Sequence, residues 1–531
     1  MPGAAAEARL SLRLPDEAAT ARLAEDVAAV LKAGDLVALS GGLGAGKTTF
    51  ARALLRAIAC DPALEVPSPT FPLRIDHALP RLKVTHADLY RLRSTDELAE
   101  IGLDEALAEG ALLVEWPEAL PAGLSEERLD VTLDLEGEGR RAEVIGHGTW
   151  PARLARSRYV RAFLDRSGWA NAVRVPLAGD ASYRTYERIT RALSPPLRGR
   201  DGEGGKTQQQ RPSPLPDTPP QGGRGPAILM NAPARAPSPR IYDGRTYDEV
   251  AHRATDIRAF VAIDLALRER GVRAPEILAA DIGAGLLLLE DLGSEPIVDP
   301  AGAPIVDRYE AAIDFLVFMH GHDWPAVAPL PDGSLYRLPP YDREAMLVEV
   351  SLFPDWSGHG GEPPFPKEQR DAFLAAWSKM LDRVGASSTI WVMRDFHSPN
   401  ILWQAGAAGT DRVGVIDFQD ALIGHPAYDV ASLAQDARVP LTIAQEAGLK
   451  ARYVEGRRAG DLRFDTETFS AAYAVMGLQR ATKLLGIFTR LALAEGKPGY
   501  LRYRERVKAI VRRNLAHRFL SDMRVWYEPY L

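Results

Sequence analysis

The sequence predicts two domains: an α/β domain built on a parallel sheet, followed by an α+β domain made of two lobes. Three observations predict this arrangement. A glycine-rich loop stands between an apolar run and a helical pattern near residue 45. An Asp-x-x-x-x-Asn pattern, followed by an Asp at the end of an apolar run, lies near residue 400. The chain has 531 residues, enough for about two to four domains of ordinary size.

The composition restricts the class of protein. Hydrophobic residues make up 46% and charged residues 25%, as in chains that form a packed core. The net charge of −7 argues against a nucleic-acid binder held by bulk positive charge. A single cysteine, Cys60, excludes an internal disulfide and a cysteine-based zinc site. With no apolar run of membrane-spanning or signal-peptide length, we expect a cytoplasmic protein without membrane contact.

The clearest boundary signal is the segment 191–226, which is rich in Gly and Pro and nearly free of large apolar residues. Such a composition cannot bury enough surface to offset the entropy of ordering it. Strand-like sequence flanks the segment on both sides. It is therefore either a linker between domains or an insertion in a hairpin turn.

A second boundary follows a predicted β-hairpin. Residues 129–135 alternate apolar and polar, Glu-Gly-Glu-Gly turns the chain, and residues 140–145 return. Helical spacing begins soon afterwards. These signals predict one domain over 10–148 and a second over 155–531, with the low-complexity insert inside the second.

The first domain contains a phosphate-binding loop. Residues 36–39 read as a buried strand, Gly41–Thr48 match G-x-x-x-x-G-K-[ST], and residues 49–58 continue as a helix. Glycines let backbone N–H groups converge on phosphate oxygens, while a lysine reaches the β- and γ-phosphates and a hydroxyl binds Mg²⁺. The nucleotide-binding residues predicted here are Gly41, Gly44, Gly46, Lys47, Thr48 and Thr49.

Two acidic residues follow strand-like runs in this domain. Asp88 comes after Leu-Lys-Val-Thr, and Glu115 ends Leu-Leu-Val-Glu. A carboxylate at the carboxyl end of a sheet strand lies beside the phosphate loop. Asp88 and Glu115 are therefore candidates to hold the metal or to position the attacking water, and otherwise are surface carboxylates at strand ends.

Five motifs in register give this domain a specific resemblance. Together with Gly41–Thr48, they are SPTF (68–71), HADLYRL (86–92), IGLDEAL (101–107) and VEWPE (114–118). In this order and spacing they resemble the TsaE family of P-loop ATPases. The resemblance implies that Lys47 and Thr48 bind ATP and Mg²⁺, with Glu115 also at the metal. It further implies that Thr70 lies in a switch-like loop and that Asp88, Glu115 and Trp116 form the catalytic face. The family supports formation of N6-threonylcarbamoyladenosine in tRNA together with TsaD and TsaB, so the contact with tRNA is indirect.

The second domain carries a phosphoryl-transfer pattern. Asp395 stands five positions before Asn400, and Asp417 ends the apolar run Val-Gly-Val-Ile. Transfer of a phosphoryl group to a hydroxyl needs a carboxylate to orient that hydroxyl and oxygen ligands for Mg²⁺. We expect Asp395 to be the base and Asn400 and Asp417 to bind the metal.

Residues upstream of this pattern suit the nucleotide. GDASYRTYER (179–188) fits a turn that covers the phosphates, which makes Ser182 a candidate there, and Glu290 ends an apolar run where a hinge between lobes is expected. The N-terminal lobe of this domain, which precedes the hinge, has no lysine outside the low-complexity insert. We therefore expect Arg184 or Arg188 to contact the ATP phosphates, because a guanidinium offers a bidentate fork.

The matching stretches in this half resemble the aminoglycoside-phosphotransferase-like kinases, which have a protein-kinase-like fold. Within them the chain is similar to the AmgK sugar kinases, through GDASYRTYER, ILMNAP, RDFHSPN and GVIDFQDALIGHPAYDVASL. Met393 and Asn231 depart from that pattern. The resemblance implies phosphorylation of the anomeric hydroxyl of N-acetylmuramate or N-acetylglucosamine in cell-wall recycling. The fold class expected for the whole chain is an α/β P-loop NTPase domain followed by an α+β two-lobed kinase-like domain.

The local excess of basic residues restricts the class of acceptor expected for the second domain. Between Arg480 and Arg513 there are ten Lys or Arg residues against two acidic ones. Such a region suits an anionic sugar better than a polycationic aminoglycoside, unless it is only a solvated helix face. Two alternatives remain: another small-alcohol acceptor, such as an aminoglycoside or choline, or a nucleotide-dependent assembly module followed by an inactive scaffold.

Overall fold

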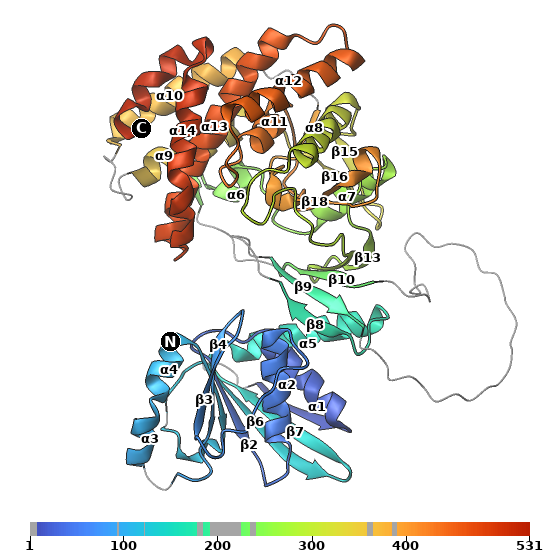
Figure 1. Ribbon diagram of the computed structural model, residues 1–531, viewed down its shortest axis with the longest axis vertical. Helices are drawn as coiled ribbons and strands as arrows, with labels where there is room; N and C mark the ends of the chain where they lie inside the picture. The colour runs from blue at the N-terminus through green and yellow to red at the C-terminus, as the bar shows by residue number, and fades with distance from the viewer. Residues whose placement is uncertain are drawn as a thin grey trace, which may run out of the picture. The chain divides into compact units, whose positions relative to one another are not determined.

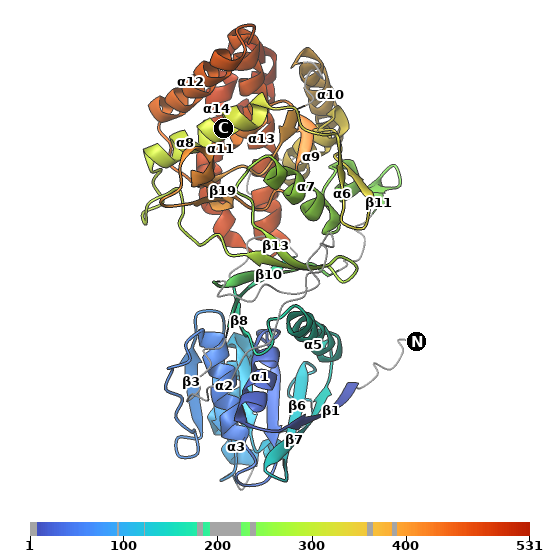
Figure 2. The same ribbon diagram turned by 90° about the vertical axis from the view of Figure 1, so that its right-hand side faces the viewer.

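The computed structural model describes residues 8–92, 95–121, 123–177, 184–191, 225–233, 240–357, 365–384 and 390–531. The chain divides into two compact units, Met1–Asn231 and Ala232–Leu531. Figure 1 and Figure 2 colour the first unit from blue to teal and the second from green to red. The boundary between these units falls later in the chain than the change of pattern at residues 148–155.

A seven-stranded mixed sheet forms the centre of the first unit, in the order β1-β7-β6-β2-β5-β4-β3. Strand β2 pairs parallel with β5 and β6, and β4 pairs parallel with β5. The carboxyl ends of β2, β4 and β5 therefore meet at one edge of the sheet. The strands are β1 (Ala8–Leu14), β2 (Leu36–Ser40), β3 (Arg74–Ala78), β4 (Lys83–Asp88), β5 (Ala111–Glu115), β6 (Arg128–Glu136) and β7 (Gly139–Gly146).

The alternation of side chains along β2 gives the sheet two hydrophobic cores. Val37 and Leu39 share a core with Phe50, whereas Leu36 packs in a second cluster with Leu103. The helices are α1 (Glu17–Ala28), α2 (Lys47–Ala59), α3 (Thr95–Ile101) and α4 (Leu103–Glu109). Successive residues of a strand point to opposite faces, so helices cover the sheet on both sides, with α3 and α4 on one side and α1 and α2 on the other (Figure 1).

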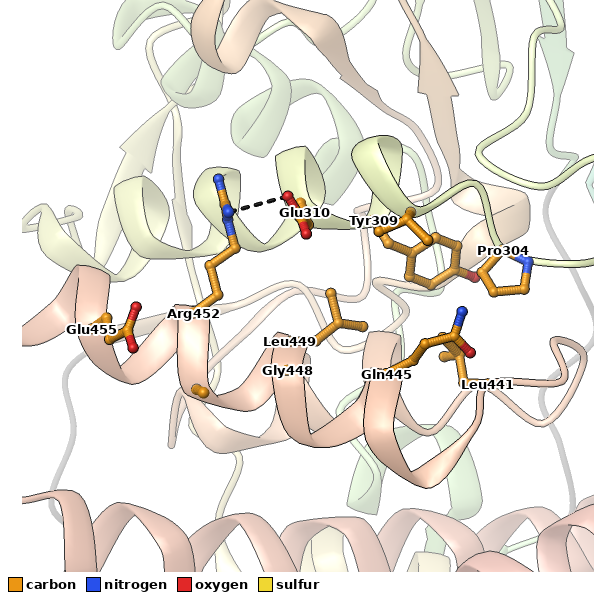
Figure 3. A pocket seen from close by; sticks show the side chains of 11 residues that line it. Pro304, Tyr309, Glu310, Leu441, Gln445, Gly448, Leu449, Arg452 and Glu455 are labelled. Carbon is orange, nitrogen blue, oxygen red and sulfur yellow. Dashed lines mark hydrogen bonds and ion pairs between the residues drawn. The ribbon is translucent and has the colours of Figure 1, made fainter.

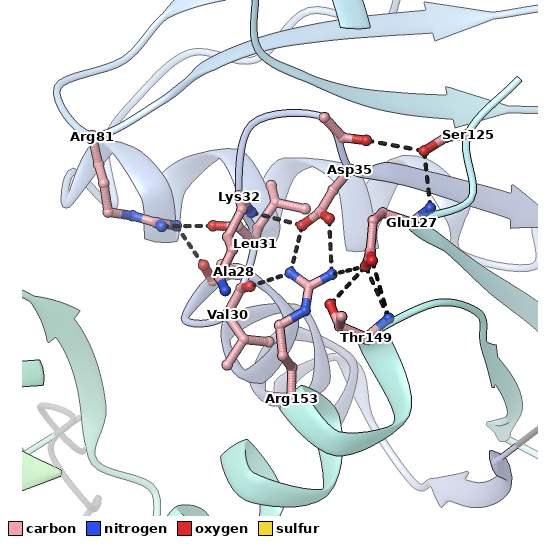
Figure 4. Close-up of polar contacts among 11 residues, drawn as sticks. Ala28, Val30, Leu31, Lys32, Asp35, Arg81, Ser125, Glu127, Thr149 and Arg153 are labelled. Atoms are coloured by element: carbon pink, nitrogen blue, oxygen red, sulfur yellow. Dashed lines mark hydrogen bonds and ion pairs between the residues drawn. The ribbon is translucent and has the colours of Figure 1, made fainter. Parts of the chain in front are cut away.

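The hairpin predicted at the end of the sheet is confirmed. Strands β6 and β7 pair antiparallel with Glu136 opposite Gly139, so two residues form the turn. The predicted helix follows as α5 (Trp150–Arg166). The guanidinium of Arg153 on this helix donates two hydrogen bonds of 2.8 Å to Asp35 and one of 3.0 Å to Glu127 (Figure 4). This ion pair fixes α5 beside the loops that precede β2 and β6.

Three further antiparallel strands belong to the first unit: β8 (Val173–Pro176), β9 (Thr185–Thr190) and β10 (Ala227–Asn231). In the register, Ala227 lies opposite Ile189. The segment 191–226 thus connects two neighbouring strands of one sheet, which agrees with an insertion in a hairpin. All but three of its residues lie outside the described part of the chain.

A buried ionic network attaches these strands to α1. Arg174 on β8 donates to both oxygens of Glu187 on β9, at 2.6 and 2.8 Å. The same guanidinium donates to Asp26 of α1 at 2.9 Å, and Arg161 of α5 donates to Asp26 at 3.0 Å. All four residues are at most 8% exposed. Buried charges in this arrangement need one another, because each would be costly to leave unpaired.

The second unit is built around α13 (Thr466–Leu493), a helix of 28 residues. It packs closely on α9 (Arg343–Trp356): a Cβ added at Gly486 would lie 2.3 Å from the backbone of Leu352, so only glycine fits there. The other helices are α6 (Tyr247–Val250), α7 (Arg258–Glu269), α8 (Val306–Gly321), α10 (Lys367–Val384), α11 (Ala427–Ala434), α12 (Ile443–Gly460) and α14 (Arg504–Leu515).

Short antiparallel pairs complete this unit. The pairs are β11 (Arg240–Tyr242) with β12 (Arg245–Thr246), β13 (Ile277–Asp281) with β14 (Leu286–Glu290), β15 (Val327–Pro329) with β16 (Leu335–Arg337), β17 (Ile390–Val392) with β20 (Leu422–Gly424), and β18 (Ile401–Trp403) with β19 (Val413–Val415). Among the described residues, no helix combines the length and the apolar character needed to cross a membrane.

Candidate functional sites

The phosphate-binding loop has a backbone that requires glycine. Gly41, Gly44 and Gly46 have φ values of 132°, 74° and 109°. A Cβ at Gly41 would lie 2.2 Å from the carbonyl oxygen of Leu133. The ammonium of Lys47 donates to the carbonyl oxygens of Gly41 at 2.7 Å and Gly42 at 3.0 Å. The loop is thus a glycine cradle with its lysine folded over it, and its residues fit a triphosphate.

Arg140, which sequence reasoning did not single out, supports this loop from the β6–β7 hairpin. Its Nε donates to the carbonyl of Ala45 at 2.9 Å, and a terminal nitrogen donates to Gly44 at 3.3 Å. The sequence signal for this contact is the Glu-Gly-Glu-Gly turn, which places Arg140 at the start of the returning strand. The hairpin therefore braces the loop through an arginine.

Trp116 faces the lysine of the loop. The Lys47 ammonium lies 3.6 Å from the centre of the Trp116 ring, within range for a cation–π contact. Trp116 has a φ of 58°, and Tyr90 packs on its ring with 4.8 Å between centroids. Burial lowers the pKa of Lys47, although the charges of Glu115 and Asp88 act in the opposite direction.

Glu115 joins the loop to β4. Its Oε2 accepts a hydrogen bond from the Thr48 hydroxyl at 3.0 Å, and its Oε1 lies 3.1 Å from Nε2 of His86. His86 is completely buried. Sequence reasoning missed His86 as a site residue, although it lies two positions before Asp88 on the same strand and therefore on the same face.

Thr70 and Asp88 form a second contact at this edge. The Thr70 hydroxyl donates to Asp88 Oδ2 at 2.8 Å. The hydroxyl oxygens of Ser68 and Thr70 are 2.7 Å apart. The structure thus brings the SPTF loop to the carboxylate of the neighbouring strand. No described group of three or more His, Cys, Asp or Glu side chains is arranged to hold a metal ion. The Thr48 hydroxyl and the Glu115 carboxylate, in contact at 3.0 Å, offer oxygen ligands of the kind that Mg²⁺ takes together with phosphates and waters.

The second candidate site lies where β17 leads into the β18–β19 hairpin. The Asn400 side chain donates to the carbonyl of Asp395 at 2.9 Å. Across the hairpin, the N–H of Ile416 donates to the carbonyl of Asn400 at 3.1 Å, and Asp417 follows with a φ of 58°. Asp395, Asn400 and Asp417 are therefore adjacent, as the sequence pattern predicts.

Asp429 of α11 fixes the start of the loop that carries Asp395. Its buried carboxylate accepts backbone hydrogen bonds from Met393 at 2.7 Å and Arg394 at 2.9 Å. Arg394 has a φ of 64°. Asp429 lies in the stretch GVIDFQDALIGHPAYDVASL, but no role for it follows from the sequence pattern. Its signal is a lone acidic residue at the start of an otherwise apolar helix.

A buried carboxylate on α9 pairs with two cations next to the loop that carries Asp395. Glu349 Oε1 accepts from Arg394 at 2.5 Å and from Lys483 of α13 at 2.6 Å. Burial would raise the pKa of Glu349, but Lys483 and Arg394 outweigh it, and the pKa lies well below the ordinary value. Burial acts in the other direction on Lys483, and Glu349 raises its pKa to about 12. Neither Glu349 nor Lys483 was found from the sequence.

These charges act on the candidate base. Burial would raise the pKa of Asp395, but the charges of Lys483 and nearby His397 and Arg394 lower it. Arg480 contributes in the same direction. Asp395 is thus an anion at neutral pH, as acceptance of a proton from a hydroxyl requires.

Of the ATP-contacting residues predicted before Asp395, the structure describes all but one. Ser182 lies outside the described residues. Arg184 precedes β9 and is 6% exposed, and Arg188 lies on β9 next to Glu187, hence on the opposite face from it. The Glu290 carboxylate accepts two hydrogen bonds from Arg273, at 2.9 and 2.6 Å. Contact of these residues with ATP stays a prediction.

A separate pocket of about 270 Å³ lies between α8 and α12 (Figure 3). None of the site residues predicted from the sequence lines it. Its only arginine, Arg452, pairs with Glu310 at 3.1 Å and with Asp314 at 2.7 Å. The pocket is therefore distinct from the Asp395 centre.

Comparison with known proteins matches the two sites to two families. Residues 14–143 match the family model described as "Threonylcarbamoyl adenosine biosynthesis protein TsaE", and residues 174–463 match the "Phosphotransferase enzyme family". The N-acetylmuramate/N-acetylglucosamine kinase of Caulobacter vibrioides is 32% identical, covering 70% of this chain and 95% of that protein. The tRNA threonylcarbamoyladenosine biosynthesis protein TsaE of Rickettsia bellii is 38% identical, covering 24% of this chain and 88% of that protein. A crystal structure of Bacillus YdiB is 27% identical, with a TM-score of 0.25, covering 30% of this chain and 99% of that one.

Both families use ATP, and the α/β P-loop fold followed by an α+β kinase-like fold agrees with the class expected from the sequence. The chain belongs to the TsaE family in its N-terminal part and to the phosphotransferase enzyme family, with the N-acetylmuramate/N-acetylglucosamine kinases, in the remainder.

Proposed function

We propose that the protein is bifunctional: an ATPase that supports formation of N6-threonylcarbamoyladenosine in tRNA, and a kinase that phosphorylates the anomeric hydroxyl of N-acetylmuramate or N-acetylglucosamine. The observation that carries this proposal is the presence of two complete phosphate-transfer sets on one chain. One contains Lys47, Thr48 and Glu115, and the other contains Asp395 and Asn400 with their neighbours. The modules are residues 10–148 and 155–531, and the protein works in the cytoplasm, where ATP and tRNA are found.

In the ATPase, the glycine loop and Lys47 bind the phosphates of ATP, and Thr48 and Glu115 would hold Mg²⁺. Asp88, which already accepts a hydrogen bond from Thr70 at 2.8 Å, orients the attacking water with Glu115. A Mg²⁺ ion held there would supply the positive charge that offsets the charge developing on the phosphates. Hydrolysis is slow and depends on proteins like TsaD and TsaB, so contact with tRNA is indirect.

In the kinase, Asp395 accepts the proton of the anomeric hydroxyl while that oxygen attacks the γ-phosphorus of ATP. The bond from the γ-phosphorus to the β–γ bridging oxygen breaks, and the products are a sugar 1-phosphate and ADP. Asn400 and Asp417 would hold Mg²⁺, which would supply positive charge to the diphosphate of the leaving ADP. Glu349 and Asp429 keep the loop that carries Asp395 in place through Arg394 and the backbone.

The experiment incubates the full chain with ATP and N-acetylmuramate and locates the transferred phosphate by NMR. We expect phosphate on the anomeric oxygen. Aminoglycosides and choline serve as competing acceptors, and phosphorylation of one of these alone would contradict the sugar assignment. Lys47→Ala is the matched control, because it removes the first nucleotide site and leaves sugar phosphorylation intact.

Calorimetry tests the two sites independently of turnover. The full chain should bind two equivalents of a non-hydrolysable ATP analogue, and Lys47→Ala one. The ATPase is then measured with and without proteins like TsaD and TsaB. A single equivalent for the unaltered chain contradicts the proposal.

A further inference from the structure

Arg480 is an enclosed cation with no partner among the described residues. It lies on α13 and is 5% exposed. Its guanidinium makes no hydrogen bond and no ion pair within the described part of the chain, whereas nearby Lys483 and Arg394 both pair with Glu349. The Arg480 nitrogens are not among the buried polar atoms that lack a partner, so the guanidinium keeps contact with solvent. An enclosed arginine is costly unless an anion meets it.

The residues around α13 place Arg480 beside the loop that carries Asp395. One turn before Arg480, Gly477 lies so close to Gln435 that an added Cβ would be 2.4 Å from the Gln435 side-chain oxygen. One turn after it, Lys483 reaches Glu349 at 2.6 Å. Residues three apart share a helix face, so Arg480 lies between these two contacts.

Both contacts lead to residues that hold the loop. Asp436, next to Gln435, accepts hydrogen bonds from the Ser398 N–H at 3.1 Å and hydroxyl at 2.7 Å. On the other side, Glu349 holds Arg394 at 2.5 Å, directly before Asp395. Burial would raise the pKa of Asp395 and of Asp436, and Arg480 is among the charges that lower it, which agrees with a place for this cation beside the loop.

We propose that Arg480 binds the carboxylate of an anionic sugar acceptor and so sets a preference for N-acetylmuramate over uncharged sugars. This inference rests on the proposed kinase function. The acceptor hydroxyl must reach Asp395, and the lactyl group of N-acetylmuramate is carried two ring carbons from the anomeric carbon. A guanidinium beside the base is therefore within reach of that carboxylate, and it can bind both oxygens at once.

The other anion that could reach Arg480 is the phosphoryl group being transferred. The two sources differ in one measurable respect. A contact with the phosphoryl group serves every acceptor equally, whereas a contact with the lactyl carboxylate serves only acceptors that carry it. The favoured source is the carboxylate, because Asn400 and Asp417, at the base of the β18–β19 hairpin, would hold the metal ion that neutralises the phosphates.

The test measures kcat and KM of the full chain with three acceptors: N-acetylmuramate, its lactyl methyl ester, and N-acetylglucosamine. Arg480→Met should lower kcat/KM for N-acetylmuramate by about 10- to 100-fold, mainly through KM, as expected when a charge-assisted hydrogen bond is lost. The ester and N-acetylglucosamine should change less than about threefold, which also shows that the variant is folded. Arg480→Lys should recover part of the loss, because it keeps the charge but not the fork. Arg490→Met, on the same helix, should change none of these values.

Equal losses for all three acceptors, or no loss for N-acetylmuramate, overturn the inference. If Arg480→Met does not fold, the acceptor ratio of Arg480→Lys decides by the same criterion. Failure of the unaltered chain to phosphorylate any of the sugars refutes the proposed kinase function itself, and the inference with it.

Discussion

Thr48 and Glu115 are hydrogen-bonded at 3.0 Å, hydroxyl to carboxylate, across two elements separated by 67 positions in the sequence. The contact joins the first turn of α2 to the last residue of β5. It exists because β2 and β5 are parallel neighbours in the sheet, with Leu39 opposite Glu115. The two side chains that we propose as magnesium ligands of the ATPase are thus already in contact in the structure.

Replacing Glu115 by Gln should lower ATP hydrolysis by about 10²- to 10³-fold while ATP binding falls less than about tenfold. The variant lacks the carboxylate proposed to hold Mg²⁺ and to orient the attacking water, but the glycine loop and Lys47 still hold the phosphates. Single-turnover hydrolysis and calorimetry measure the two quantities. Glu126→Gln, at an exposed position of the same unit, is the control. Unchanged hydrolysis in the Glu115 variant would remove this residue from the mechanism.

Asp395→Asn should lower sugar phosphorylation by about 10²- to 10⁴-fold, because the amide cannot accept the proton. The KM for ATP should change little, since the nucleotide contacts lie elsewhere. Initial rates at saturating ATP give the result, with Asp371→Asn on the exposed face of α10 as the control. A loss of only a few-fold would mean that another group orients the hydroxyl.

Arg174→Met should destabilise the first unit by about 3–5 kcal/mol, because Asp26 and Glu187 remain as buried anions without their shared cation. Scanning calorimetry should show a lower midpoint for this unit. Arg9→Met removes an arginine whose side chain is 67% exposed and pairs with Glu143, and it should leave the midpoint unchanged. Similar midpoints for the two variants would contradict the structural role of the buried network.

Asp264 makes the second unit less stable as the pH rises. Both of its carboxyl oxygens are buried without a partner among the described residues, and burial raises its pKa to about 8. Between about pH 4 and 8 the folded chain holds this proton and the unfolded chain does not, so the free energy of unfolding falls by up to about 1.4 kcal/mol per pH unit.

In Asp264→Asn this part of the pH dependence should disappear, and the melting temperature at pH 8 should move closer to that at pH 5. Melting curves at the two pH values measure this effect. Glu269→Gln, on the exposed face of the same helix, is the control and should keep the pH dependence of the unaltered chain. The same pH dependence in wild type and Asp264→Asn would show that the carboxyl group is ionised in the folded protein.

Local patterns account for the parts of the two sites that the sequence identified. The loop Gly41–Thr48 and the pair Asp395 and Asn400 are each close in sequence, so their spacing alone reveals their chemistry. Asp88 and Glu115 were found because each ends a strand of a parallel sheet, and such ends meet at one edge. The β6–β7 hairpin was likewise evident from strict alternation.

Other site residues belong to no local pattern. His86 reaches Glu115 only because β4 and β5 pair, and Lys483 reaches Glu349 only because α13 packs on α9. The segment 191–226 had two interpretations until the register of β9 and β10 made its flanking strands neighbours.

The sequence by itself determined the two chemistries, since a glycine cradle and a short Asp-Asn spacing are properties of neighbouring residues. Only the tertiary structure decided which distant charges meet: Asp26 with Arg174, and Glu349 with Arg394 and Lys483. The physical reason is that a buried ion pair requires a partner of opposite charge at hydrogen-bond distance, and packing rather than sequence separation determines that distance.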